Sequence, residues 1–222
     1  MAQTTGQGKQ RIMGLGNWYD ENIVPRVIRC ACSAPAIMKV RQQVVPLAAG
    51  QVFELGCGGG INQQFYDAQK VTYFAGMDPS PKGLDYARSA ADGRGFQADL
   101  RQGFGEAIPF PAASFDCVVC TYTLCSVDDP AQVLREMHRI LKPGGRLLFA
   151  EHGKAPDENV RTWQGRIEPV WKRLAGGCHL TRPISSAVAG GGFAVAPIGA
   201  RYAPKTPRWA GWMEWGVGLK AG

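Results

Sequence analysis

A glycine-rich turn between two regular segments constrains this chain more than any other feature of its sequence. The apolar residues 52–55 lead into the turn at 56–60, and a run compatible with a helix begins near Ile61. A strand, a glycine turn and a helix in this order open the nucleotide-binding unit of α/β proteins. A tight turn that binds nothing has the same pattern, so the neighbouring residues must decide between the two.

The glycines at positions 56, 58 and 60 indicate which ligand fits the turn. The dinucleotide fingerprint G-x-G-x-x-G requires a glycine at position 61, where this chain has Ile61. Because glycine has no Cβ, a ligand can lie directly against the backbone of the turn. Glu54 precedes the first glycine by two residues, and a carboxylate attracts a cationic group such as an α-ammonium but repels a phosphate. The turn therefore predicts a ligand with a cationic end.

A second acid, Asp78, ends the apolar run 71–77 and is followed by Pro79. A carboxylate at the end of the second strand, about 20 residues past the glycine turn, is placed to accept both hydroxyls of a ribose. The alternative is that Asp78 caps the next helix.

Strands and helices alternate through the middle of the chain. The clearest helix covers residues 130–141, where Asp128 or Asp129 provides the cap, Pro130 opens the helix and apolar side chains recur along one face. This alternation predicts an α/β protein with a doubly wound parallel sheet. Strands are expected near residues 51–55, 71–77, 96–102, 115–121 and 146–151, with closing strands at 193–198 and 213–220.

The chain divides into an arm and a domain. Residues 1–48 are expected to form an N-terminal helical arm over the active site, where Trp18 and Tyr19 line the acceptor entrance or pack in the core. Residues 49–222 form the main domain, with an acceptor-site insertion at about 153–182.

This insertion is rich in tryptophan and arginine, and we expect Trp163 in the acceptor pocket. At its end, Thr181 is expected to cap a helix that starts with Arg182 and Pro183.

The 222 residues carry a net charge of +7, with the basic excess in the arm and after position 130. Such a surface is either simply solvated or makes weak contact with anionic lipid. No aromatic and basic motif of an RNA-binding module is present, so we expect no nucleic-acid partner. The polar residues 1–11 lack the core of a signal peptide, and no apolar run reaches 18 residues, which favours a cytoplasmic location.

Seven cysteines at irregular spacing predict free buried thiols rather than a disulfide framework. Cys117 and Cys120 form C-x-x-C, but on an expected strand their side chains point to opposite faces. We therefore expect no metal site and no redox pair.

Several segments carry a resemblance to a known group of enzymes. The pattern E-x-G-x-G-x-G, the acid at position 78, and residues 107–110, 114–116 and 139–145 resemble class I S-adenosylmethionine-dependent methyltransferases, including those of ubiquinone C-methylation and phospholipid N-methylation. Residues 123–127, 149–152 and 177–182 resemble the methyltransferase-like thiol S-methyltransferases and their bacterial relatives. The resemblance spans about residues 50 to 220. The animal members carry an apolar N-terminal membrane anchor, which we do not expect here.

The resemblance implies a Rossmann-like, doubly wound, seven-stranded sheet, mostly parallel with an antiparallel last strand and helices on both faces. It also implies S-adenosyl-L-methionine as cofactor. Phe104 stands where many relatives have an aspartate for the adenine amino group, so we expect adenine to be held by stacking and by backbone groups. The implied cofactor-binding residues are Glu54, Gly56, Cys57, Gly58, Gly60, Asp78, Pro79, Gly105, Glu106 and Thr121.

A small thiol acceptor would need help to ionise, because a free thiol has a pKa of about 8.5. His152, at the end of the fifth strand, is the first candidate for a base, with a structural histidine as the alternative; Glu151 and His179 are further candidates. Cys125 and Cys178, with the three aromatic residues named above, are expected to line the acceptor pocket.

Three functions remain open on the sequence. The first is S-methylation of small thiols. The second is N-methylation of a phospholipid head group of the phosphatidylethanolamine type, or of another small molecule, with the basic and tryptophan-rich part meeting the membrane. The third is a binding or regulatory protein that holds the cofactor without turnover. No pattern indicates the oligomeric state.

Overall fold

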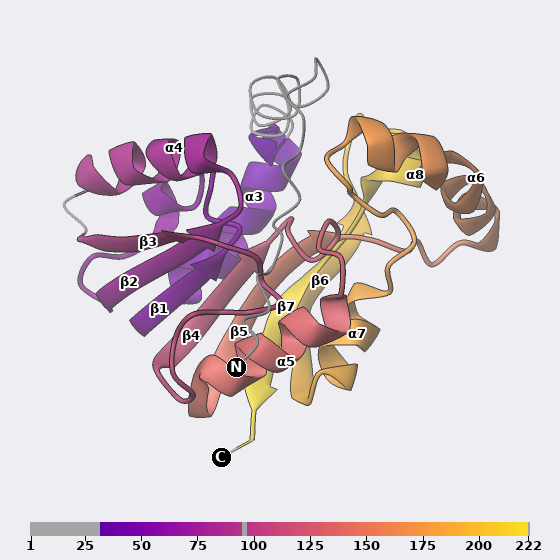
Figure 1. The fold of residues 1–222 in the computed structure, drawn as a ribbon. Coiled ribbons are helices and arrows are strands. Elements are labelled where there is room, and N and C mark those ends of the chain that lie inside the picture. Colours follow the sequence, from indigo (N-terminus) through magenta and orange to yellow (C-terminus); the bar gives the residue numbers. More distant parts are fainter. Residues whose placement is uncertain (1–31, 95–96, 222) are drawn as a thin grey trace, which may run out of the picture.

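The computed structural model describes residues 32–94 and 97–221, and it contains one seven-stranded sheet (Figure 1). The strand order is β3-β2-β1-β4-β5-β7-β6, and β7 runs antiparallel to both of its neighbours. This confirms the predicted Rossmann-like sheet with an antiparallel last strand. The strands are β1 (Gly50–Leu55), β2 (Val71–Asp78), β3 (Ala98–Gln102), β4 (Phe115–Thr121), β5 (Leu141–His152), β6 (Phe193–Tyr202) and β7 (Trp212–Lys220).

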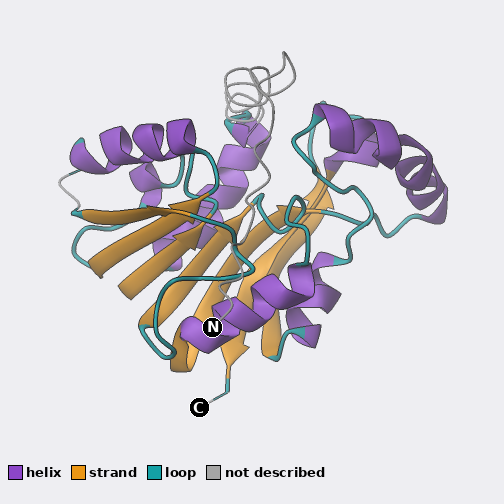
Figure 2. Ribbon diagram, in the orientation of Figure 1, coloured by secondary structure: helices purple, strands orange, loops and turns teal. Residues whose placement is uncertain are grey.

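Helices cover both faces of the sheet (Figure 2). One face carries α3 and α4, the other carries α5 and α7, and α6 packs with α8 beyond one end of the sheet. The helices are α3 (Pro35–Val44), α4 (Pro81–Asp92), α5 (Pro130–Ile140), α6 (Glu158–Leu174), α7 (Ile184–Gly190) and α8 (Arg208–Gly211), with 3₁₀ turns η1 (Val45–Leu47) and η2 (Gln63–Phe65).

Two hydrophobic cores lie on the two faces of the sheet. Cys117 packs in the core that includes Val40 and Val44 of α3, whereas Cys120 packs in the core under α5 and α7. Both thiols are buried. The expectation that this C-x-x-C pair is split between the faces of a strand is confirmed.

The predicted signals of α5 are present in the structure. Asp129 is the cap, since its Oδ1 accepts a hydrogen bond from the amide of Gln132 at 2.9 Å, and Pro130 is the first helical residue. The helix ends at Ile140, one residue earlier than expected. Leu141 already belongs to β5, because it pairs with Phe115 of β4.

The helix expected from near Ile61 is not present, since the chain between β1 and β2 forms only the 3₁₀ turn η2. Further boundaries also differ from the sequence prediction. Thr181 does not cap a helix: α7 begins later, at Ile184, and the Thr181 hydroxyl donates instead to Oε2 of Glu168 on α6 at 2.7 Å. A partly buried carboxylate offers that hydroxyl a stronger acceptor. Strand β6 also continues past the predicted end at position 198 to Tyr202, because it pairs with β7 along its whole length.

The expected first helix of the arm, with Trp18 and Tyr19, lies outside the described residues. The second helix of the arm is α3, which packs against β5 and β7. Within the described residues, no helix combines the length and the apolar character that crossing a membrane requires.

Candidate active site

A cavity of about 930 Å³ lies at the carboxyl ends of β1, β2 and β4. In open α/β sheets this edge, where the strand order reverses, is the usual place for a ligand. Seven of the ten predicted cofactor residues line the cavity: Gly56, Gly58, Asp78, Pro79, Gly105, Glu106 and Thr121.

The glycine turn and Asp78 lie in direct contact. The Gly58 amide donates to Oδ2 of Asp78 at 3.0 Å, and the Ser80 amide donates to Oδ1 at 2.8 Å. Burial raises the pKa of the Asp78 carboxyl, and these two hydrogen bonds partly offset the rise. The cap of α4 is Ser80, whose hydroxyl accepts from the Gly83 amide. Asp78 is therefore not the helix cap, and its carboxyl group stands at the cavity wall.

Glu54 lies beneath the turn rather than at the cavity surface. It is 3% exposed and accepts hydrogen bonds from the Tyr66 hydroxyl at 2.7 Å and from Nδ2 of Asn62 at 2.9 Å. Burial raises the pKa of the Glu54 carboxyl to about 7, against the lowering effect of these bonds and of Arg41. Both carboxylate oxygens are thus engaged within the protein.

Arg41 of α3 is a cavity residue that the sequence analysis missed. It is buried, and its Nη1 donates to Oδ1 of Asn62 at 2.7 Å and to Oγ1 of Thr121 at 2.5 Å. Its guanidinium carbon lies 4.9 Å from the ring centroid of Tyr122. Its buried Nε has no hydrogen-bond partner among the described residues. An arginine within the apolar stripe of an expected helix was the available signal.

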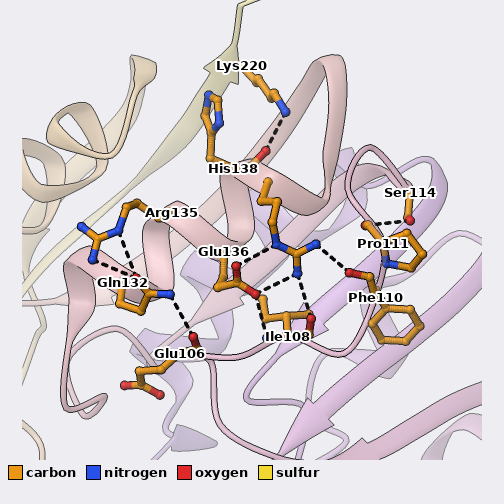
Figure 3. A network of polar contacts seen from close by, with 11 residues as sticks. Glu106, Ile108, Phe110, Pro111, Ser114, Gln132, Arg135, Glu136, His138 and Lys220 are labelled. Atoms are coloured by element: carbon orange, nitrogen blue, oxygen red, sulfur yellow. Dashed lines mark hydrogen bonds and ion pairs between the residues drawn. The ribbon is translucent and has the colours of Figure 1, made fainter.

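The loop after β3, which carries Phe104 and Gly105, is held by an ion pair on α5 (Figure 3). Arg139 donates to the carbonyls of Phe110 and Ile108, each at 2.8 Å, and Glu136 accepts from the Ile108 amide at 2.9 Å. The two segments that resemble methyltransferase landmarks, 107–110 and 139–145, thus meet here.

Within this loop, the Phe104 side chain faces the cavity, whereas the Glu106 side chain is bonded to the start of α5. The Phe104 side chain lines the cavity and is 67% exposed, so one ring face is free for stacking. Oε1 of Glu106 accepts from the amides of Asp128 and Asp129, both at 3.1 Å, and this ties the loop to the start of α5.

Three predicted residues lie behind the cavity wall. Cys57 packs against Leu84 and Ala87, and Gly60 adopts φ +61° against α4. Neither contributes to the lining, and nor does Glu54.

Glu151, a candidate base, holds the loop that follows β4. It is fully buried, and its Oε1 accepts from the amides of Thr123 at 2.8 Å and Leu124 at 2.9 Å, while Oε2 accepts from the Cys125 amide at 3.3 Å. Burial raises the pKa of this carboxyl. An anion fixed by three amides positions a loop, and this geometry does not favour proton transfer with an acceptor.

His152 meets two of the predicted acceptor-pocket residues. Its Nε2 lies 3.3 Å from Sγ of Cys178, which in turn lies 3.1 Å from Sγ of Cys125. None of the three lines the cavity, but Ser126, next to Cys125 in the chain, does. The structure therefore brings together three residues from separate segments at the edge of the cavity.

The remaining candidates point elsewhere. Nδ1 of His179 lies 3.1 Å from Oε1 of Glu168, so this ring belongs to the contact between α6 and the segment after it. Trp163 of α6 is 56% exposed and does not line the cavity. Trp18 and Tyr19 lie outside the described residues.

Comparisons with known proteins agree with this geometry. Residues 53–149 match the family model described as a methyltransferase domain. The chain is 44% identical over 136 residues to the thiol S-methyltransferase TMT1B of Rattus norvegicus, a match that covers 59% of this chain and 54% of the relative. It is 40% identical over 149 residues to TMT1B of Homo sapiens, which covers 61% and 57%. The chain thus spans about half the length of the curated relatives it matches.

A solved S-adenosylmethionine-dependent methyltransferase of Mesorhizobium loti shares the fold, with a TM-score of 0.63 and 20% identity over 84% of this chain and 99% of that one. The glycine turn at 56–60 and the strand-end acid Asp78 both lie within the residues that the family model matches. Residues 53–149 of this chain therefore match the methyltransferase domain family, and the described residues have the fold of a solved S-adenosylmethionine-dependent methyltransferase.

Proposed function

We propose that this chain is an S-adenosylmethionine-dependent S-methyltransferase of small, fairly apolar thiols. The observation that carries the proposal is the 40–44% identity to proteins named thiol S-methyltransferases. The fit of the cofactor to the cavity supports it independently.

The cavity offers a group for each part of the cofactor. The carboxyl group of Asp78 suits the ribose hydroxyls, and the bare backbone at Gly58 leaves room for the ligand, since a Cβ there would lie 2.4 Å from Cγ of Asp78. Phe104 offers a ring face to adenine. When bound, the cofactor supplies a sulfonium methyl group, whose displacement by a thiol gives a thioether, S-adenosylhomocysteine and a proton.

Arg41 and Glu54 suit the amino-acid end of the cofactor. The Nε of Arg41, which has no partner among the described residues, is a donor for its carboxylate, and the carboxyl group of Glu54 lies beneath the turn on which the α-ammonium would rest. Asn62 links the two side chains, accepting from Arg41 and donating to Glu54. The network thus presents the positive charge of Arg41 to the carboxylate of a zwitterion and places the Glu54 carboxyl group beneath its ammonium.

On the acceptor side, the residue assigned to activation of the thiol is His152. Glu151 is committed to three amides and His179 to Glu168, whereas the ring of His152 lies against Cys178 at the edge of the cavity. Most of the remaining work is alignment and exclusion of water, because the sulfonium is already a good leaving group.

A panel of methyl acceptors tests the proposal. The purified chain is incubated with cofactor and, in turn, an alkyl thiol, an aryl thiol and phosphatidylethanolamine vesicles, while S-adenosylhomocysteine and the methylated product are followed by mass spectrometry. We expect thioethers from the thiols and no product from Asp78→Ala. Turnover confined to the lipid amine, or cofactor binding without turnover on any acceptor, would refute S-methylation.

One observation favours the lipid amine as a second candidate. Trp163, Val170 and Leu174 are 56%, 60% and 65% exposed on α6 and recur at helical spacing, and the guanidinium of Arg166 lies 5.6 Å from the Trp163 ring. An exposed apolar stripe with basic neighbours suits an interfacial helix. Stimulation of turnover by vesicles, lost in Trp163→Ser, would support this alternative.

A further inference from the structure

Three metal-ligating side chains converge at the acceptor side of the cavity. We propose that Cys125, His152 and Cys178 bind one zinc ion and leave its fourth position open for the sulfur of the acceptor. The metal site stands on the geometry alone; the role of the fourth position rests on the proposed function.

The distances within the cluster suit a metal. Sγ of Cys178 lies 3.1 Å from Sγ of Cys125 and 3.3 Å from Nε2 of His152, and all three ligand atoms lie within 4.8 Å of one another. Zinc binds sulfur at about 2.3 Å and nitrogen at about 2.0 Å in a tetrahedron, which separates the ligand atoms by about 3.5–3.8 Å. Small side-chain rotations of these residues reach that spacing.

The set of ligands indicates which ion and which kind of site. Two thiolates and an imidazole select zinc over magnesium or calcium, which prefer oxygen. No fourth histidine, cysteine or acid in the described part of the chain joins the group. Structural zinc sites have four protein ligands, whereas catalytic sites have three and keep one position open. The cluster matches the second kind.

The backbone holds the ligands in place without the ion. Glu151 fixes the Cys125 amide, and the Cys125 carbonyl accepts from the His179 amide at 2.8 Å. Gly176 and Gly177 both adopt positive φ, +59° and +83°, and so form the turn just before Cys178. Glycine tolerates this conformation at little cost. A site whose supports are already made loses less entropy when it binds a ligand.

The cluster also lies where an acceptor would arrive. Ser126, next to Cys125, and Gly176, two residues before Cys178, both line the cavity. His152 ends β5, beside the loop that Glu151 holds. Because chain neighbours of two ligands line the cavity, we expect an acceptor bound there to approach the fourth position of the ion from this side.

Such an ion would favour the thiolate form of an acceptor that is mostly protonated at neutral pH. When the acceptor sulfur binds zinc, its proton leaves to solvent and the sulfur keeps its electron pair as a metal-bound thiolate. His152 would then contribute to activation of the thiol as a zinc ligand through Nε2, and the proton would go to solvent rather than to its ring. A thioether product carries no charge and is a weak ligand, so it dissociates and the position reopens.

Metal binding is measured first, on the reduced, metal-free full chain. Cobalt(II) titration should give one ion per chain, with the absorption of a tetrahedral thiolate site, and zinc should displace it. Cys125→Ser, His152→Ala and Cys178→Ser should each weaken binding by more than about 100-fold. Cys117→Ala removes a buried cysteine outside the proposed site, in the core that includes α3, and should leave binding unchanged.

The wild-type chain alone can overturn the site, whatever the variants do. A reduced chain that binds neither cobalt nor zinc, and that forms a Cys125–Cys178 disulfide in air, would make the two cysteines a redox pair. Binding that survives in Cys178→Ser would place the ion elsewhere.

An alkyl thiol is then added to the cobalt form, with the alcohol of equal chain length as control. We expect the thiol alone to shift the charge-transfer band. If the spectrum of the bound cobalt does not change when the thiol is added, the ion has no position open to the acceptor and this part of the proposal is refuted. If thiols are methylated equally well with and without metal, the role of the ion is refuted and the proposed function stands. If the chain binds metal but does not methylate thiols, the metal site stands and the proposed function is refuted.

Discussion

A Cβ atom on Gly58 would lie 2.4 Å from Cγ of Asp78, so these two residues, 20 positions apart in the chain, share one space at the cavity wall. The Gly58 amide also donates to the Asp78 carboxyl group at 3.0 Å. The glycine is therefore required for the position of the acid at the cavity wall.

Substitution at this pair should remove cofactor binding. We expect Asp78→Ala to lower S-adenosylmethionine affinity by roughly 2–3 kcal/mol, because two hydroxyls lose a charged acceptor. Gly58→Val should abolish binding, since its side chain would displace the acid. Calorimetry measures both. Gly165→Ala, whose Cβ would meet nothing within 4 Å, is the matched control. Unchanged affinity in a folded Asp78→Ala variant would exclude the acid from the site.

Arg41 should contact only the carboxylate group of the cofactor. Arg41→Gln is expected to weaken S-adenosylhomocysteine by about 10- to 100-fold, the range for a lost charged hydrogen bond. The affinity for 5′-methylthioadenosine, which lacks the amino-acid end, should change little. Lys39→Gln, an exposed position on the same helix, is the control. Equal losses for both ligands would mean that Arg41 only shapes the cavity.

Glu54 should make the protein less stable at higher pH. Its pKa rises on folding from 4.5 to about 7, because burial disfavours the charged form. The folded state therefore binds the proton more tightly, and stability is greatest below pH 4.5 and falls until about pH 7. At about 1.4 kcal/mol per pH unit, the loss amounts to about 3 kcal/mol.

Urea unfolding of wild type and Glu54→Gln at pH 5 and pH 8 measures this effect. Between pH 5 and pH 8, the unfolding free energy of the variant should rise by about 3 kcal/mol relative to that of wild type, since the neutral side chain of the variant does not titrate. Glu158→Gln, at an exposed position of α6, should show no such gain. A constant difference between wild type and Glu54→Gln would place the titration elsewhere.

The ion pair of Glu136 and Arg139 should support the adenine side of the cavity. Arg139→Ala removes the donor to the Phe110 carbonyl and one of the two donors to the Ile108 carbonyl, and should cost roughly 1–3 kcal/mol of unfolding free energy. It should also weaken cofactor binding. Arg135→Ala removes a side chain of the same helix that is bonded to Gln132 alone, and should leave both quantities near wild type. A loop that tolerates Arg139→Ala in thermal unfolding and in calorimetry would contradict this role.

The local patterns of the sequence were enough for much of the fold. The turn at 56–60, the strand that ends at Asp78 and a cap at one of the two acids before Pro130 depend on residues close in the chain, and the structure contains each of them, although no α-helix follows the turn. The opposite orientation of Cys117 and Cys120 followed from the period of a strand. Such features are readable because a short segment encodes them by itself.

Contacts between distant segments could not be predicted from such local patterns. Thr181 was wrongly predicted as a cap because its acceptor, Glu168, lies on another helix. Arg41 reaches Thr121 across 80 positions, and Cys125, His152 and Cys178 come from three segments with no metal-binding spacing. The pairing of β5 with β7 and the crossing of α3 over the sheet decide these neighbours. The sequence by itself determined the strands, most of the helices and the place of the glycine turn; only tertiary packing, which depends on register between distant strands, decided which side chains meet at the acceptor side.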